Sequence, residues 1–351
     1  MRRRRFLQAA VAGTLMQTGP LMAQDTLFVP PEEDPHAGTL MMWPASRGVY
    51  RDPVFLRMVQ RTIAEIASTI ASFEPVYLLA DASLHPQIRK QVSGSVTLWD
   101  IPTEDLWARD AGPLFAWQGA QRVVSHIAFN GWGRKQVHTH DAQVAARIAA
   151  RMGAPLISSG LQGEAGGVDH DGHGLLIAHE SSWVIRNRNP GLSRAQITDR
   201  LLAAYGADRM IWSPGLRGQD ITDYHIDSLA RFTGPGRVLI NLPDHPDTDD
   251  PFHMAALDTH DALTAAGLAV DVIPEPRRRR VKSPDFVASY ANYYACNGAV
   301  IAAEFGDRDT DDIAARALAR HYPGREIVTL NVDPLGEIGG GIHCATQQIP
   351  A

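Results

Sequence analysis

Short apolar runs alternate along the chain with longer stretches in which apolar residues recur every three or four positions. The runs Thr39–Trp43 and Val76–Ala80 predict buried strands. Between them, the segment 53–73 begins with a proline and places apolar residues at spacings of four, three and four from Val59 to Ile70. This spacing predicts an amphipathic helix that packs one face against the strands.

The same alternation continues to the C-terminus. Further strands are predicted at 96–99, 156–158, 175–178, 210–212, 237–242, 269–273, 299–302 and 325–330, and further helices at 86–92, 138–152, 193–205, 251–266 and 310–321. Alternating strands and helices indicate an α/β fold with one dominant core. No Gly/Ser-rich or Pro-rich linker divides the 351 residues, so we expect a single domain.

The first residues follow a different pattern. Four arginines, Arg2–Arg5, precede an uncharged, moderately apolar stretch that runs up to Met22. This arrangement is typical of a Tat-type export signal, with cleavage after Ala23. We therefore assign residues 1–23 to a signal peptide and 24–351 to the mature domain, and we expect a periplasmic or secreted protein. The alternative, a disordered basic tail, leaves the apolar stretch unexplained.

Composition limits the classes of function. A hydrophobic content of 44% with 21% charged residues describes an ordinary globular protein. No later segment approaches the apolar length of a membrane span. Without the four leading arginines the chain has 29 basic and 39 acidic residues, a formal charge of −10. This charge disfavours nucleic acid as a partner and mildly favours cationic ligands. Two cysteines, Cys296 and Cys344, argue against a disulfide scaffold.

A glycine-rich turn near the C-terminus presents one of these cysteines. Three glycines, Gly339–Gly341, remove every Cβ, so the backbone can take φ > 0 and lie close to a neighbour or a substrate. Cys344 follows directly, and a reachable, oriented thiol is what a nucleophile requires. Taken alone, a cysteine is more often a small buried hydrophobe. The interpretation therefore depends on the groups that the rest of the chain brings to it.

Polar clusters in three predicted loops supply such groups. An Arg-Asp pair at Asp110 precedes Gly-Pro, a glycine-rich acidic segment begins at Glu164, and His225 lies two residues before Asp227. In a strand, residues two apart share one face, and a carboxylate beside an imidazole fixes its tautomer or shifts its pKa. The first pair also fits a plain turn salt bridge.

The segment after Glu164 offers a metal site through Asp169, His170, Asp171 and His173, but the spacing matches no metal motif.

The carboxylates favour one class of substrate. A peptide or simple amide hydrolase needs an oxyanion hole made of donors, not a ring of anions. Carboxylates around a nucleophile suit a guanidinium, whose planar donor fork they bind bidentately. They would also destabilise a free thiolate, so the thiol is expected to ionise only when the cationic substrate arrives.

At this point the residues resemble a known family. From about residue 35 to 350, the chain is similar to the agmatine deiminases and bacterial-type peptidylarginine deiminases of the guanidino-modifying (pentein) superfamily. The matching segments are Pro35-His36, Met42–Pro44, Trp107–Pro113, Phe129–Gly133, Glu164–Gly166, Asn187–Pro190, Asp220–Asp227, Ser289–Asn292, Phe305–Asp307 and Gly340–Gln348.

The resemblance implies a fold, an activity and site residues. The implied fold is a closed, five-bladed α/β-propeller with a central site. Cys344 corresponds to the nucleophile that attacks the guanidinium carbon, and Asp110 and Asp227 to the residues that clamp its nitrogens. His225 corresponds to the residue that protonates departing ammonia and then activates water.

The remaining implied residues are less direct. Glu164 matches a glutamate that orients the histidine or touches substrate, and Asn292 matches a site asparagine of the peptidylarginine branch. Trp43, Trp107 and Trp132 are candidates for the aromatic walls of the site, although each is equally suited to the core. The family uses no metal or cofactor. We expect a small cationic guanidino substrate and allow for a homodimer.

The chain also departs from the family. Tyr224 stands where the family usually has Gly before the site histidine, and Ala165 stands where it has Gly. A ring beside His225 either narrows the pocket or points outward without a role. These departures do not change the predicted chemistry, but they leave the identity of the substrate undecided.

The leading hypothesis is hydrolysis of agmatine to N-carbamoylputrescine and ammonia through a covalent thiouronium intermediate. Peptidylarginine or free arginine is the alternative, and export favours it over cytoplasmic putrescine synthesis. An amidinotransferase or a non-catalytic guanidino-binding protein is a further alternative, although retention of Cys344, His225, Asp110 and Asp227 argues against the latter.

Overall fold

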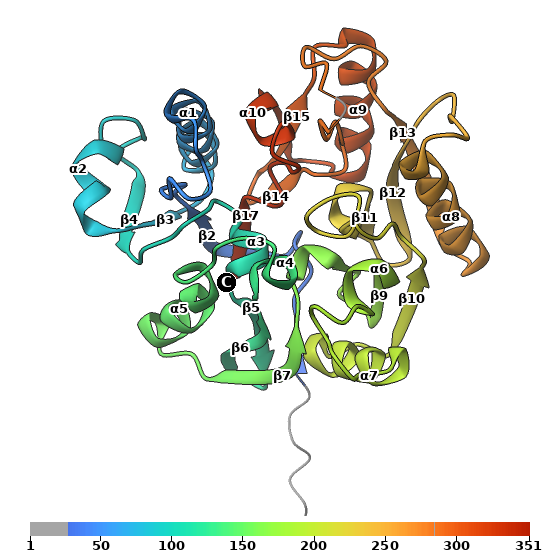
Figure 1. The fold of residues 1–351 in the computed structure, drawn as a ribbon, viewed down its shortest axis with the longest axis horizontal. Helices are drawn as coiled ribbons and strands as arrows, with labels where there is room; N and C mark the ends of the chain where they lie inside the picture. Colours follow the sequence, from blue (N-terminus) through green and yellow to red (C-terminus); the bar gives the residue numbers. More distant parts are fainter. Residues whose placement is uncertain (1–26, 284) are drawn as a thin grey trace, which may run out of the picture.

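The computed structural model describes residues 27–283 and 285–351, which form five small sheets with helices on the outside (Figure 1). The export signal predicted at residues 1–23 lies outside the described residues. No helix in the described ranges is long and apolar enough to cross a membrane. The prediction of a single α/β domain is confirmed.

Each sheet combines at least one antiparallel and at least one parallel strand pair. The first sheet runs in the order β17-β2-β3-β4, with bounds Thr346–Pro350, His36–Met42, Val76–Ala80 and Val96–Asp100. β17 is antiparallel to β2, whereas β2, β3 and β4 are parallel. The last strand of the chain therefore completes a sheet that begins near residue 36.

The second and third sheets follow along the chain. The second sheet has the order β1-β5-β6-β7, with bounds Leu27–Phe28, Leu114–Gln118, Gln121–Ala128 and Leu156–Gln162. The third has the order β10-β9-β8, with bounds Arg209–Ser213, Leu175–His179 and Val168–His170. In both sheets a hairpin-like antiparallel pair is followed by a parallel strand.

The last two sheets repeat this scheme. The fourth sheet has the order β11-β12-β13, with bounds Ala230–Gly234, Arg237–Leu242 and Ala269–Pro274. The fifth has the order β14-β15-β16, with bounds Tyr294–Cys296, Ala299–Glu304 and Glu326–Asn331. The shared pairing pattern of the five sheets is a topological repeat that has no visible period in the sequence.

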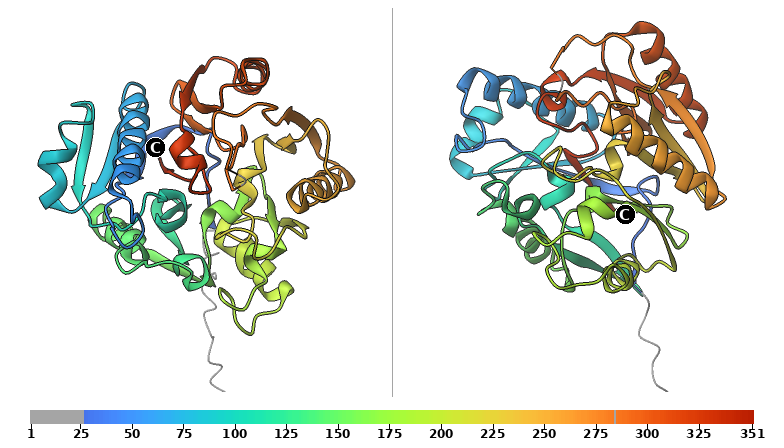
Figure 2. Two further views of the ribbon diagram at one scale, coloured as in Figure 1. Left: turned by 45° about the horizontal axis from the view of Figure 1, so that its top comes forward. Right: turned by 45° about the vertical axis from the view of Figure 1, so that its right-hand side comes forward.

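The longer helices cover the outside of the sheets (Figure 2). They are α1 (Pro53–Ile70), α5 (Val144–Met152), α7 (Arg194–Tyr205), α8 (Pro251–Ala265) and α9 (Arg308–His321). In α1 the Asp52 side chain caps the first turn at Pro53, and the predicted stripe of Val59, Ile63, Ile66 and Ile70 is buried. The sequence pattern thus fixed both the start and the inner face of this helix.

Short helical elements connect the strands. The α-helical turns are α2 (His85–Ile88), α3 (Ala108–Ala111), α4 (Gly131–Arg134), α6 (Glu180–Trp183) and α10 (Asp333–Gly336). The 3₁₀ turns are η1 (Ala82–Leu84), η2 (Asp141–Gln143), η3 (Ala165–Gly167) and η4 (Ile226–Ser228). Of these, α3 and α4 lie near the middle of the molecule (Figure 1).

The prediction of the long elements is confirmed with three corrections. The helix predicted at 86–92 is only one turn long, because α2 ends at Ile88. The helix predicted at 138–152 is split into η2 and α5, with the buried carboxylate of Asp141 turned back to accept from the amides of Glu104 and Asp105. The strand assumed around His225 is wrong, because Ile226–Ser228 form the 3₁₀ turn η4. Several inner strands, among them β5, β6, β11 and β14, were not predicted.

Candidate active site

Asp110 is held at the centre of the molecule by α3 and α4. Its Oδ2 accepts a hydrogen bond of 2.9 Å from the indole Nε1 of Trp132, which is buried at 2% exposure. Its Oδ1 is buried and has no hydrogen-bond partner among the described residues. A buried carboxylate oxygen without a donor is costly, so this oxygen is suited to a cationic ligand.

Asp227 provides a second carboxylate of the same kind. Its Oδ2 accepts from the ring Nδ1 of His343 at 2.7 Å, and its Oδ1 is buried without a partner in the described chain. The predicted side-by-side arrangement of His225 and Asp227 on a strand is wrong, but the 3₁₀ turn still brings both side chains into the site. Tertiary contacts, not strand periodicity, produce their proximity.

His225 lies between two carboxylates. Its Nε2 is 3.1 Å from Oε2 of Glu164, and its Nδ1 is 3.7 Å from Oδ1 of Asp110. The first distance is a hydrogen bond and the second is not. The imidazole is therefore anchored at one nitrogen, while the other faces Asp110 beyond hydrogen-bonding distance.

Cys344 completes the group from the C-terminal turn. Its Sγ donates to Oδ2 of Asp227 at 3.4 Å and accepts from Nδ2 of Asn292 at 3.1 Å. The thiol is 6% exposed, so it is enclosed by the same groups that orient it. Cys296, by contrast, is fully buried on β14, and burial raises the pKa of its thiol to about 12.

The glycines before Cys344 are needed mainly because neighbouring side chains lie very close to their backbone, and less because of their φ angles. Only Gly339 has a positive φ, +89°. A Cβ on Gly340 would lie 2.5 Å from the ring of Trp107, and one on Gly341 would lie 2.6 Å from Oδ1 of Asn292. A side chain at either position would displace a neighbour of the thiol.

Gly166 marks the point where three of the site groups converge. A Cβ at this position would lie 2.7 Å from Oδ1 of Asp110, 3.0 Å from Oδ2 of Asp227 and 3.0 Å from Nδ1 of His225. The two aspartates and the histidine thus surround one small volume against the backbone of η3. The structure brings together the predicted residues Asp110, Glu164, His225, Asp227, Asn292 and Cys344.

Charge in this enclosed volume shifts the pKa values. Burial raises the pKa of Asp110 to about 7; nearby Asp227 and Glu164 act in the same direction, while His225 opposes them. Burial alone would lower the pKa of His225, but the carboxylates around it raise it to about 9. Burial and two carboxylates raise the pKa of the Cys344 thiol well above its usual range. At neutral pH the site therefore holds an imidazolium and a protonated thiol.

The three tryptophans are buried, and their contacts differ. Trp43 is 1% exposed within the main hydrophobic cluster, Trp107 packs against Gly340, and Trp132 donates to Asp110. Trp132 has φ of +54°, a strained conformation that the Asp110 contact helps to explain. Trp107 and Trp132 therefore support the carboxylate and the thiol turn, and Trp43 is a core residue.

The candidate metal-binding segment has other partners. Asp169 accepts from the guanidinium of Arg231 and the amide of Phe232, and Asp171 accepts from the amides of His173 and Leu175. These carboxylates stabilise an ion pair and a turn. Their oxygens are occupied by protein donors.

Sequence reasoning did not single out Arg188, His343 or Glu32 as site residues. Arg188 is fully buried and donates from Nε to both oxygens of Glu164, at 3.1 and 2.8 Å, and from Nη1 to Asp223 at 2.7 Å. Arg188 and His343 both lie within segments of the family resemblance, but their partners are distant in sequence. Only a signal that pairs positions across the chain could have found them.

Tyr224 points away from the site. Its ring stacks on His179 with centroids 4.8 Å apart and meets Phe252 edge to face, within the third hydrophobic cluster. Its φ is +67°, and that of Asp223 is +60°. The left-handed backbone explains why glycine suits this position, and burial of the tyrosine ring offsets the strain. The suggestion that the ring narrows the pocket is therefore wrong.

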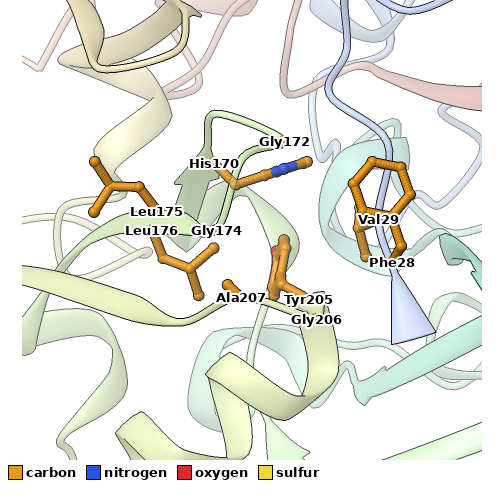
Figure 3. Close-up of a pocket in the computed structure, with 10 residues that line it drawn as sticks. All are labelled: Phe28, Val29, His170, Gly172, Gly174, Leu175, Leu176, Tyr205, Gly206 and Ala207. Carbon is orange, nitrogen blue, oxygen red and sulfur yellow. The ribbon is translucent and has the colours of Figure 1, made fainter. Parts of the chain in front are cut away.

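A surface hollow lies away from these groups (Figure 3). Its ten lining residues lie around β1, β9 and the end of α7, and include His170 and Tyr205. None of the residues that converge on Gly166 lines it. The hollow is therefore separate from the candidate active site.

Comparison with known proteins places these features in context. Residues 28–350 match the model of the Porphyromonas-type peptidyl-arginine deiminase family. The chain is 32% identical to a putative agmatine deiminase of Streptomyces coelicolor, over 93% of this chain and 99% of that protein. It is also 32% identical to the agmatine deiminase of Medicago truncatula, over 92% and 96%. Its fold is similar to the agmatine deiminase of Enterococcus faecalis, with a TM-score of 0.85 and 25% identity over 93% and 96%.

We expect Tyr224→Ala to destabilise the protein more than Tyr224→Gly. Both variants lose the stacked ring, a cost of about 3–5 kcal/mol for a buried aromatic residue. Alanine keeps the left-handed strain, whereas glycine relieves it, so the glycine variant should be more stable by about 1 kcal/mol. Urea unfolding of the two variants measures the difference. Equal stability would show that position 224 is not strained.

Proposed function

Because the chain belongs to the Porphyromonas-type peptidyl-arginine deiminase family, we propose that it hydrolyses the guanidino group of agmatine, giving N-carbamoylputrescine and ammonia. The agmatine deiminases at 32% identity cover nearly the whole chain, and they support agmatine within this family. The reaction class is hydrolysis of a C–N bond in a linear amidine.

One observation carries the proposal. Oδ1 of Asp110 and Oδ1 of Asp227 are buried carboxylate oxygens without a donor among the described residues, and the other oxygen of Asp227 accepts from the thiol of Cys344. A guanidinium supplies the missing N–H donors in a planar fork and the missing positive charge. An uncharged amide would bring no positive charge, so the negative charges of the two carboxylates would still repel each other.

In the first half-reaction the substrate cation activates the thiol. Once the guanidinium neutralises the two aspartates, the main electrostatic cause of the raised Cys344 pKa is removed, so the thiol releases its proton to bulk water. Sγ then bonds to the guanidinium carbon. The imidazolium of His225 passes its proton to the departing nitrogen, the C–N bond breaks, and ammonia leaves behind a cationic thiouronium and a neutral imidazole.

In the second half-reaction a water molecule takes the place of ammonia. His225 accepts one proton of this water as its oxygen attacks the thiouronium carbon. The C–S bond breaks, the second water proton restores the thiol, and the ureido product is released. Glu164, held by Arg188, anchors Nε2 of His225 and leaves Nδ1 facing Asp110 and the reacting volume.

Arginine in a peptide or as the free amino acid is the second candidate substrate. The description of the matched family favours it, and the guanidinium clamp does not distinguish it from agmatine. The difference lies at the far end of the substrate, where an ammonium, an α-amino acid or a peptide backbone would be bound.

The finer features of the fold and assembly also belong to this proposal. We infer that the five sheets are the blades of a closed propeller; pairing of β17 with β2 across the chain ends supports this. We also propose a homodimer. Light scattering of the purified mature protein measures its molar mass and so tests this oligomeric state.

An assay with three substrates tests the function. Purified residues 24–351 should release ammonia and a ureido product from agmatine, and less from arginine or from an arginine-containing peptide. Cys344→Ala should lose activity by several orders of magnitude because no thiouronium forms. Cys296→Ala, which alters the other thiol, should stay active. Absence of ureido product from all three substrates would reject the proposal.

The pH dependence of kcat/KM should be bell-shaped. Asp110, with a pKa of about 7, must be ionised to bind the cation, so activity should fall about tenfold per unit below this pH. His225, with a pKa of about 9, must be protonated in the free enzyme, so activity should fall above it. Steady-state rates from pH 5 to 10.5 measure both limbs. A rate that rises steadily through pH 10 would contradict the role of His225.

We propose that the protein is exported through the Tat route, on the basis of the twin-arginine pattern at Arg2–Arg5. Expressed with its first 23 residues in a bacterium with a Tat system, the protein should reach the periplasm or medium. Changing Arg3 and Arg4 to lysine should keep it in the cytoplasm. Cell fractionation and immunoblotting measure the distribution, and export in a strain lacking Tat would contradict the route.

A further inference from the structure

The residue before the nucleophile has contacts that the proposed reaction does not use. His343 is 3% exposed, and both of its ring nitrogens face carboxylates. Nδ1 lies 2.7 Å from Oδ2 of Asp227, and Nε2 lies 3.1 Å from Oε2 of Glu32. Each distance is within hydrogen-bonding range.

The two carboxylates beside the ring are held in their ionised form. Although burial opposes it, the cations around Glu32, namely Arg231, His343 and Arg109, hold the pKa of its carboxyl well below the usual range. Burial likewise opposes ionisation of Asp227, but the hydrogen bond and charge of His343 hold the pKa of its carboxyl below the usual range. An ionised carboxylate only accepts hydrogen bonds, and the ring of His343 is the group that bridges these two carboxylates.

We propose that His343 is a positioning residue for substrate binding: its buried ring bridges Glu32 and Asp227, holds Oδ2 of Asp227 and so presents Oδ1 of this aspartate to the guanidinium. The inference rests on the proposed function. It assigns His343 no contact with the substrate and no proton transfer, since its action passes through Asp227.

Comparison of the two histidines supports this division of roles. His225 has one close carboxylate and one at 3.7 Å, so it can release a proton and take one up. His343 has a close carboxylate at each nitrogen, so a turn of its ring would leave a buried carboxylate without this partner, at high cost. One histidine is free to exchange protons and the other is fixed.

A set of charged groups keeps His343 in place. Glu32 also receives Nη2 of Arg109 at 2.6 Å and Nη2 of Arg231 at 3.1 Å, and its Oε1 accepts from the amide of Ala295. The carbonyl of His343 faces Nε of Arg109 at 3.5 Å. The charged groups that face the His343 ring or Glu32 are thus Asp227, Glu32, Arg109 and Arg231. The thiol of Cys344 also donates to Oδ2 of Asp227.

Binding to an inactive protein tests the inference without turnover. In a Cys344→Ala background, His343→Gln should weaken agmatine affinity about tenfold to a hundredfold, because glutamine carries no charge and can donate to only one of the two carboxylates. In a Cys344→Ala/Asp227→Asn background the same change should add little. Isothermal titration calorimetry at pH 8 gives all four affinities. His260→Gln on α8 is the matched control and should leave affinity unchanged.

The pH dependence of binding separates positioning from a merely structural loss. Without the hydrogen bond from the His343 ring, the pKa of Asp227 should rise, so the affinity of the His343→Gln protein should fall at a higher pH than that of its parent. If this variant does not fold, as judged by circular dichroism, Glu32→Gln loosens the same ring from Nε2 and should shift the pH dependence in the same direction.

Two outcomes would overturn the inference. One is unchanged affinity in a folded His343→Gln or Glu32→Gln protein; the other is an equal loss with and without Asp227. If the Cys344→Ala parent binds neither agmatine nor an arginine-containing peptide, the proposed function fails instead, which the same titration distinguishes.

Discussion

The structure depends on the balance of negative charge at its centre. Asp110, Glu164, Asp227 and Glu32 are all nearly or fully buried, and carboxylates in such a place repel one another unless cations accompany them. The chain supplies two kinds of cation. Fixed arginines pair with Glu164 and Glu32, while the rings of His225 and His343 lie between pairs of carboxylates.

This balance is complete except at two oxygens. Oδ1 of Asp110 and Oδ1 of Asp227 lack donors in the described part of the chain, and the other oxygen of Asp227 accepts from the thiol. Burial and the charges of these two aspartates raise the pKa of the thiol and keep it protonated until a cation arrives. Substrate binding and nucleophile activation are therefore consequences of one electrostatic arrangement. This arrangement prevents a reactive thiolate from forming when no substrate is bound.

Close approach and strain are concentrated around the same groups. The backbone at Gly166, Gly340 and Gly341 passes so near to site side chains that a Cβ would displace them. Trp132, Asp223 and Tyr224 adopt positive φ, and each lies beside a site residue or precedes one. The surrounding contacts, among them the Tyr224–His179 stack and the Arg188–Asp223 ion pair, hold these conformations. These strained backbone conformations keep the aspartates and the histidine in fixed positions.

The sequence by itself determined the α/β class, the long helices and most outer strands, because each carries its own periodicity or apolar run. Ordered motifs also identified the six residues that the structure brings together. The tertiary structure decided the rest. It corrected the strand at His225 to a 3₁₀ turn and directed Tyr224 into the core. It also made Arg188, His343 and Glu32 partners of the site, with His343 and Glu32 more than three hundred residues apart. Local patterns record which face of an element is buried, but the pairing of buried charges depends on contacts between distant segments that only the folded chain creates.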